Sequence, residues 1–222
     1  MPLELVVRDR DVSAVEAGGL TQDDAVKKCT QAVRAGGVAV FPTDTVYGIG
    51  LLVSAHPMGA DELFRIKRRP REKKIPLLIP SVEAIFEYGE NVDHRTEALA
   101  RQFWPGGLTL VVRASKKVPP AYRNLDGTVA LRVPGRSFAL ALLENLGEAM
   151  AVTSANTSGL PAPIDDINIE EAIAGQVAAV VRAGKTDCGE SSTIVDCTKT
   201  EMAVLRAGAI AQTAIEAVWR KS

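Results

Sequence analysis

The sequence predicts a single α/β domain built on a mixed sheet. Short runs rich in Val, Ile and Leu alternate with stretches of helical periodicity along the whole chain, a pattern typical of α/β proteins. The sequence shows no internal repeat, low-complexity tract or obvious linker, and 222 residues suit one large domain. We therefore expect residues 1–222 to form one unit.

Local signals place the elements. Thr21 and Asp24 mark the N-cap of the first helix, and Pro42 ends the second strand because proline has no N–H to donate. Pro105 and the two glycines after it break the helix that precedes the strand at 108–113. The predicted strands are residues 3–7, 38–41, 75–79, 108–113, 128–133, 150–153, 178–181, 193–195 and 203–205. The predicted helices are residues 21–36, 58–67, two segments before residue 104, 137–145, a segment starting near 165 and a terminal helix from 212.

Composition excludes several classes of function. The net charge of −1 gives no global attraction to nucleic acid or membranes, so any anion site must be local. No apolar run approaches the roughly 18 residues of a transmembrane helix, and the N-terminus does not resemble a secretory signal. Three cysteines without CxxC spacing favour reduced thiols in the cytoplasm. With only two histidines, a zinc site or a histidine-based catalytic pair has little to be built from.

Polar residues gather after several predicted strands. The densest set is the loop at 42–50, where two threonines, Asp44 and Tyr47 are followed by two glycines that we expect to let the backbone turn tightly. Similar hydroxyl, amide or guanidinium groups recur at 128–134, 153–156, 191–193 and 206–208. Any one of these sets can be an ordinary turn, but ligands of open α/β sheets bind at strand ends, so the repetition indicates a binding site.

Seven of the ten residues from Arg65 to Lys74 are Lys or Arg. Pro70 is expected to interrupt the helix that leads into this run. One interpretation is a solvated basic loop. The other is a site for a polyphosphate or an RNA backbone, where Arg gives bidentate contacts and Lys a mobile charge.

Taken in order, these segments resemble the YrdC-like family over residues 36–208. An ordered set is far more specific than any single tripeptide. The matching segments are 42–48 (Pro-Thr-Asp-Thr-Val-Tyr-Gly), 67–70 (Lys-Arg-Arg-Pro), 104–109 (Trp-Pro-Gly-Gly-Leu-Thr), 132–134 (Arg-Val-Pro), 154–159 (Ser-Ala-Asn-Thr-Ser-Gly), 192–196 (Ser-Thr-Ile-Val-Asp) and 206–208 (Arg-Ala-Gly).

The resemblance implies a twisted sheet around a basic cavity for ATP and L-threonine, without the extra C-terminal domain of longer relatives. It implies a nucleotidyltransferase, L-threonylcarbamoyladenylate synthase, which joins L-threonine, bicarbonate and ATP and releases pyrophosphate. Mg²⁺ would accompany the ATP, and no protein-bound metal is expected. The product would pass to a tRNA threonylcarbamoyl-transferase complex that modifies position 37 of tRNA, and binding of double-stranded RNA is a further expectation.

By motif position, the resemblance divides the site residues between two sides of the cavity. The threonine side comprises Thr43, Arg132, Ser154 and Ser192. The nucleotide side comprises Lys67, Arg69, Lys73, Thr128, Asn156 and Arg206. We expect Lys67 and Arg69 to be catalytic by neutralising phosphate charge, because adenylation needs positioning and electrostatic stabilisation rather than a nucleophile.

The chain departs from the family pattern in places. Arg136-Ser137 replaces a common His-Pro pair, Ala207 replaces a proline, Pro80 stands where some relatives have a histidine, and the segment between Arg69 and Pro76 is longer than usual. The alternatives are a non-catalytic paralogue that binds RNA or nucleotide in the same cavity, and an enzyme that uses another carbamoyl adenylate. Aromatic residues at only 5% argue against a reader of single-stranded RNA.

Overall fold

The computed structural model describes residues 1–7, 19–73, 75–135 and 137–222. Lys74 of the basic run and Arg136 of the family departures lie outside the described residues. Within those ranges, ten strands form one mixed sheet in the order β1-β8-β2-β3-β7-β4-β6-β5-β9-β10. Parallel pairs such as β1 with β8 and β5 with β9 occur beside antiparallel pairs such as β3 with β7 and β5 with β6. The predicted single-domain α/β fold with a mixed sheet is confirmed.

The elements follow the predicted alternation closely. The strands are β1 (Leu3–Val6), β2 (Ala39–Pro42), β3 (Tyr47–Leu52), β4 (Leu77–Leu78), β5 (Leu108–Arg113), β6 (Thr128–Arg132), β7 (Met150–Ser154), β8 (Ala179–Arg182), β9 (Thr193–Asp196) and β10 (Ala203–Arg206). The α-helices are α2 (Gln22–Arg34), α3 (Asp61–Lys67), α4 (Ile85–Tyr88), α5 (His94–Phe103), α6 (Phe138–Leu146), α7 (Glu171–Ala174) and α8 (Gln212–Trp219). Two single 3₁₀ turns are η1 (Pro120–Tyr122) and η2 (Asp166–Asn168).

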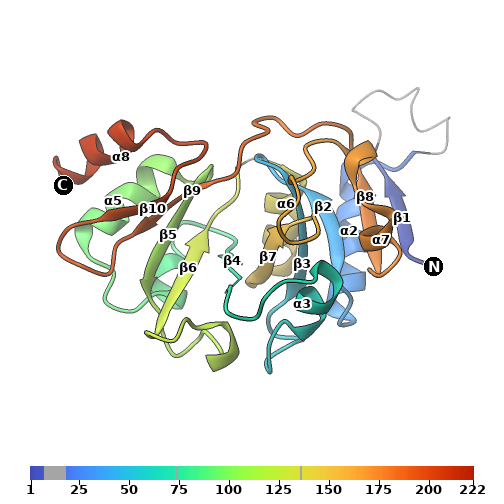
Figure 1. Cartoon of the computed structure of the whole chain (residues 1–222), viewed down its shortest axis with the longest axis horizontal. Helices are drawn as coiled ribbons and strands as arrows, with labels where there is room; N and C mark the ends of the chain where they lie inside the picture. The colour runs from blue at the N-terminus through green and yellow to red at the C-terminus, as the bar shows by residue number, and fades with distance from the viewer. Residues whose placement is uncertain (8–18, 74, 136) are drawn as a thin grey trace.

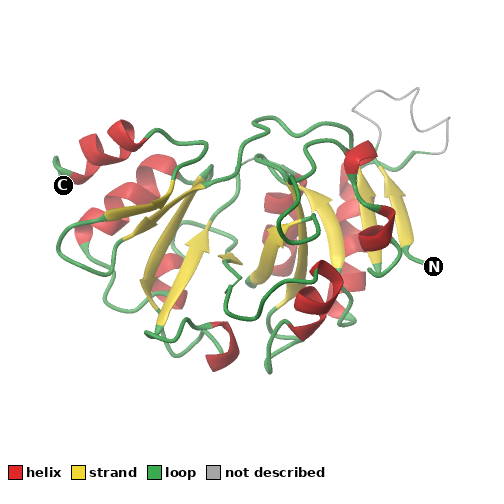
Figure 2. Ribbon diagram, in the orientation of Figure 1, coloured by secondary structure: helices red, strands yellow, loops and turns green. Residues whose placement is uncertain are grey.

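The sheet divides into two halves at the two-residue strand β4 (Figure 1). The first half holds β1, β8, β2, β3 and β7, and the second half holds β6, β5, β9 and β10. Strand β4 joins them by pairing with β7 on one side and β6 on the other. Figure 2 shows helices packed on the strands of each half, and the segment between β8 and β9 crosses from the first half to the second.

Apolar side chains hold these layers together. Helices α2 and α6 pack against one face of the first half, where Val26, Val33 and Phe138 are buried with Phe41 of β2. The larger core cluster covers the opposite face and extends into the second half, where it includes Leu99 of α5 and Trp219 of α8. As predicted, Thr21 caps α2, because its side-chain oxygen accepts a hydrogen bond from the backbone N–H of Asp24.

Two expectations about local structure were wrong. Gly48 and Gly50 do not form a tight turn: they lie in β3, which is absent from the predicted strands and runs antiparallel to both β2 and β7. A Cβ on Gly50 would lie 2.7 Å from Cγ2 of Val152 and 2.9 Å from the carbonyl oxygen of Ala151. These glycines therefore allow the strands to pack closely. The helix expected near residue 165 is only the 3₁₀ turn η2 followed by the four-residue helix α7.

Candidate functional site

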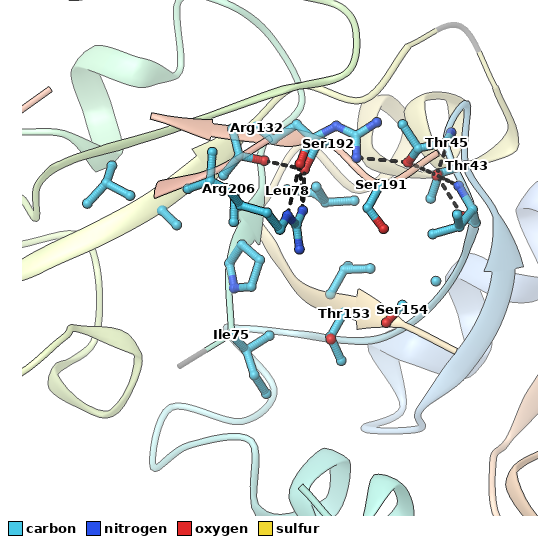
Figure 3. Close-up of a pocket in the computed structure, with 18 of the residues that line it drawn as sticks. Thr43, Thr45, Ile75, Leu78, Arg132, Thr153, Ser154, Ser191, Ser192 and Arg206 are labelled. Carbon is cyan, nitrogen blue, oxygen red and sulfur yellow. Dashed lines mark hydrogen bonds between the residues drawn. The ribbon is translucent and has the colours of Figure 1, made fainter. Parts of the chain in front are cut away.

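A cavity of about 370 Å³ lies where the two halves of the sheet meet. Its walls come from β3 and β7 of the first half and from β5, β6, β9 and β10 of the second, together with the loops beside them (Figure 3). The polar lining residues are Thr43, Thr45, Tyr47, Arg69, Thr109, Tyr122, Asn124, Arg132, Thr153, Ser154, Ser191, Ser192 and Arg206. The apolar lining includes Val46, Ile75, Pro76, Leu78, Val111, Ala130, Val152 and Ile194.

Arg132, the last residue of β6, is held by three hydrogen bonds to different parts of the fold. Its Nη2 donates to Oδ1 of Asp44 at 2.6 Å, its Nη1 donates to Oγ1 of Thr45 at 3.0 Å, and its Nε donates to the carbonyl oxygen of Gly106 at 2.9 Å. Burial lowers the pKa of Arg132, and the neighbouring Asp44 carboxylate opposes that shift. A guanidinium has five N–H bonds, so two have no protein partner among the described residues and are available to a ligand.

The hydroxyls of the β2–β3 loop (residues 43–46) form a chain with a defined direction. Oγ1 of Thr43 donates to the carbonyl oxygen of Val46 at 2.7 Å. A hydroxyl has one hydrogen, so in the 2.9 Å contact between the two side chains Thr45 must be the donor to Thr43. Oγ1 of Thr43 also accepts from the backbone N–H groups of Thr45 and Val46. The Thr43 hydroxyl lines the cavity, yet its hydrogen-bonding capacity is used by its own loop.

The segment between β8 and β9 closes one side of the cavity. Its backbone N–H groups at Cys188 and Gly189 donate to the carbonyl oxygens of Asp44 and Thr45. Further along, Ser192 is held by Arg206 of β10, whose Nη2 donates to the Ser192 carbonyl oxygen at 2.6 Å and to its hydroxyl at 3.1 Å. The Ser192 hydroxyl also lies 2.8 Å from that of Thr109.

Three other hydroxyls are available to a ligand. Figure 3 shows Thr153 and Ser154, at the end of β7, and Ser191 around the open part of the cavity. Within the described ranges, none of the three side-chain hydroxyls has a hydrogen-bond partner. Solvent or a ligand must supply the hydrogen-bond partners of these three hydroxyls. They are therefore the lining hydroxyls best placed to bind a ligand.

Lys67 lies behind the cavity wall. It ends α3 with only 1% of its surface exposed, and its Nζ donates to the carbonyl oxygens of Ser154 and Asn156. Burial and, to a smaller extent, the nearby Arg69 lower the pKa of Lys67 to about 8, and Glu170 opposes the shift. The Lys67 ammonium therefore holds the backbone that follows β7, and it does so without a carboxylate in salt-bridge contact among the residues described.

The predicted site residues are only partly brought together. Six line the cavity, namely Thr43, Arg69, Arg132, Ser154, Ser192 and Arg206. Four do not, namely Lys67, Lys73, Thr128 and Asn156. Lys73 lies on an exposed loop, where its carbonyl oxygen accepts from Nε of Arg69 at 2.9 Å. Oγ1 of Thr128 bonds to Asp126 and Asn124, and the amide nitrogen of Asn156 donates to two carbonyl oxygens of its own loop. The roles assigned to all ten stay predictions.

Sequence reasoning left out several residues that the structure brings to the cavity. Asp44, Thr45 and Ser191 belong to polar clusters that stood out in the sequence, and Thr109 ends one of the family motifs. Their polar side chains and their place in these clusters and motifs were therefore a usable signal for the site. No local pattern indicated that Asp44 would pair with Arg132, because the two residues lie in different halves of the sheet.

In the described part of the chain, no group of three or more His, Cys, Asp or Glu side chains could hold a metal ion. The same part contains no helix long and apolar enough to cross a membrane.

Fold and site together define an α/β protein with a polar cavity between the two halves of one mixed sheet. The model of the Sua5/YciO/YrdC family, described as telomere recombination, matches residues 31–208. The chain therefore belongs to this family, as the resemblance predicted.

Individual relatives agree with this assignment. The chain is 34% identical over 186 residues to a threonylcarbamoyl-AMP synthase of Pyrococcus abyssi, covering 84% of this chain and 54% of that protein. A crystal structure of P. abyssi Sua5 complexed with L-threonine superposes with a TM-score of 0.84 at 29% identity, covering 98% of this chain and 60% of the other. E. coli YciO gives a TM-score of 0.80 at 26% identity, with 94% and 97% covered. The chain spans 54% and 57% of the length of the P. abyssi and Bacillus subtilis relatives.

Proposed function

We propose that this chain is an L-threonylcarbamoyladenylate synthase, a nucleotidyltransferase that makes threonylcarbamoyl-AMP from L-threonine, bicarbonate and ATP. The observation that carries the proposal is the cavity itself: three guanidinium groups and three available hydroxyls converge in one pocket between the halves of the sheet. Family membership adds relatives that are named for this activity. The described lining contains three arginines, and one of them, Arg132, is paired with Asp44. The basic character that the family resemblance implies for the whole cavity therefore belongs to the proposal.

On the threonine side, we assign the carboxylate of L-threonine to the two remaining N–H bonds of Arg132. A planar guanidinium suits a carboxylate better than a point charge does. Ser154 and Ser191 are candidates to bind the substrate's other polar groups, since their hydroxyls face the cavity. The Thr43 hydroxyl is engaged by its own loop, so its contribution is to shape the pocket rather than to donate a hydrogen bond.

On the nucleotide side, Arg69 and Arg206 are the lining cations proposed to neutralise the phosphates. The amine of L-threonine first forms an N–C bond to bicarbonate with loss of water, giving a carbamate. A carbamate oxygen then attacks the α-phosphorus of ATP, an O–P bond forms, and the bond to the β-phosphate breaks to release pyrophosphate. Charge neutralisation and alignment are the protein's contribution to these steps.

Mg²⁺ enters this scheme as part of the substrate, carried by the phosphates of ATP. The described residues do not fit a resident metal site, because they contain no suitable ligand cluster and the one carboxylate that contacts a lining arginine, that of Asp44, is already paired. Delivery of the product to a tRNA threonylcarbamoyl-transferase complex, and direct binding of RNA, remain expectations that follow from this assignment.

Pyrophosphate release tests the proposal. Purified protein is incubated with MgATP, with and without bicarbonate, and each amino acid is supplied in turn. Release that requires both L-threonine and bicarbonate is expected. Release with another amino acid would redirect the assignment to a different carbamoyl adenylate. No release, together with RNA affinity that falls steeply with salt, would support the non-catalytic alternative.

A further inference from the structure

We propose that Asp44 is a positioning residue of the site, which orients the Arg132 guanidinium so that its remaining N–H bonds receive the carboxylate of the substrate amino acid. This inference rests on the proposed function, which assigns a carboxylate to Arg132. The sequence placed Asp44 only in a polar loop, and the family resemblance gave it no role of its own.

The first support is the geometry of the contact. Asp44 lies on the β2–β3 loop of the first half of the sheet, and Arg132 ends β6 of the second half. Their 2.6 Å contact is buried, with the two side chains 15% and 8% exposed respectively. With Thr45 and the Gly106 carbonyl oxygen bound at its other nitrogens, the guanidinium is held from three directions. An arginine side chain otherwise has many rotamers, so this arrangement selects one orientation.

The second support is the charge balance. Asp44 is the carboxylate that forms a salt bridge with Arg132 in the described structure, and the pair is close to neutral. A buried and unpaired guanidinium would be costly, so the carboxylate compensates the charge of Arg132 and holds it in place when no ligand is bound. Because much of the charge is already compensated, a substrate carboxylate is recognised by the direction of two N–H bonds more than by net charge.

The third support is the space around Asp44. A Cβ on Gly135 would lie 2.8 Å from Cβ, Cγ and Oδ2 of Asp44. The Asp44 side chain therefore packs directly on the backbone just beyond the Arg-Val-Pro motif that contains Arg132. Gly135→Ala would displace the Asp44 carboxylate while leaving both members of the ion pair present, which gives a second and independent way to disturb the contact.

The experiment compares L-threonine with L-threoninamide, in which the carboxylate is replaced by a neutral amide. The affinity of the full chain for each compound is measured by calorimetry, and pyrophosphate release gives kcat and the KM for L-threonine and ATP. The variants are Asp44→Ala, Asp44→Asn and Gly135→Ala. Glu87→Ala is the matched control, because it removes a carboxylate from an exposed ion pair with Lys117 that does not line the cavity.

We expect the wild type to prefer L-threonine, and this preference to fall about tenfold in Asp44→Ala and Gly135→Ala, the scale of one charge-assisted hydrogen bond. Asp44→Asn should keep the preference, because an amide oxygen can still accept from Nη2 of Arg132. The KM for L-threonine should rise while the KM for ATP stays within about twofold, since the ion pair lies on the threonine side. The control should match the wild type.

An unchanged preference in Asp44→Ala or Gly135→Ala would overturn the proposal, because a merely structural role would weaken both compounds equally. Loss of the preference in Asp44→Asn would also overturn it. The preference for L-threonine would then depend on the negative charge of Asp44 and not on the hydrogen bond that orients Arg132. If Asp44→Ala fails to fold, Gly135→Ala and Asp44→Asn decide the question. The affinities from calorimetry do not depend on catalytic turnover, so they test Asp44 separately from the proposed function. A wild type that binds L-threonine selectively but releases no pyrophosphate would refute the proposed function and leave the Asp44 result intact.

Discussion

Gly48 offers a sharp test of why glycines occupy β3. A methyl group added at Gly48 would lie 2.9 Å from Cγ1 of Val152 in the neighbouring strand β7, far inside the usual carbon–carbon contact of about 3.5–4.0 Å. A methyl at Gly50 would meet Cγ2 of Val152 at 2.7 Å and also the carbonyl oxygen of Ala151 at 2.9 Å. The first clash involves a side chain that can be shortened, whereas the second includes backbone that cannot.

The magnitudes follow from packing. Gly48→Ala should lower the free energy of unfolding by about 1–3 kcal/mol, the usual cost of overfilling a packed site. Val152→Ala should cost at least about 1.6 kcal/mol, from roughly 0.8 kcal/mol for each of two methyl groups. In the double variant of these two residues the added methyl occupies vacated space, so the combined cost should be smaller than the sum by about 1–2 kcal/mol. Gly50→Ala combined with Val152→Ala should recover clearly less, because the contact with the Ala151 carbonyl oxygen remains.

Urea denaturation of the wild type, three single variants and two double variants measures both couplings. Gly48 and Val152 both line the cavity, so pyrophosphate release should also recover in their double variant. Additive costs for Gly48 and Val152 would refute the reasoning. Equal coupling for Gly50 would refute it as well, since the backbone contact would then have no effect.

Three further outcomes can be checked. Burial lowers the pKa of Lys67 to about 8 from 10.5 in the unfolded chain, so between these values the unfolded state binds the extra proton and stability rises with pH. The rise is at most about 3.5 kcal/mol at roughly 1.4 kcal/mol per pKa unit. The difference between wild type and Lys67→Met in urea titrations from pH 7 to 10.5 should show it, and parallel curves would contradict it. Thr43→Val should cost about 2–3 kcal/mol in unfolding free energy, because the partners of the lost hydroxyl stay buried. Thr43→Ser keeps the bond to the Val46 carbonyl oxygen and should cost under about 1 kcal/mol. Equal costs would show that the hydroxyl is not essential to the loop. Ser191→Ala should raise the KM of one substrate by roughly two- to tenfold with an unchanged urea midpoint, since its hydroxyl has no partner within the described structure; a loss of stability would instead indicate a structural bond.

Much of the fold was determined by local sequence. The cap at Thr21 and the helical spacing of Val26, Cys29 and Val33 define α2, and the apolar run at 108–113 defines β5. Such signals depend on residues a few positions apart, which is why they can be recognised without a structure. Strand β3 was missed because its two glycines have low strand propensity, and the reason for their presence lies on a different strand, at Val152.

The candidate site shows the same division. Residue types and motif order in the sequence were enough to select Arg132, Ser154, Ser192 and Arg206, all of which line the cavity. Only the tertiary structure decided how the polar groups are used: Lys67 points to backbone carbonyl oxygens behind the wall, and Arg132 pairs with Asp44 across the two halves of the sheet. Hydrogen bonds and ion pairs act over a few ångströms in space, whatever the separation along the chain. Chemistry that a short motif contains can therefore be predicted from sequence, while the partner of each buried charge is set by the packing of distant elements.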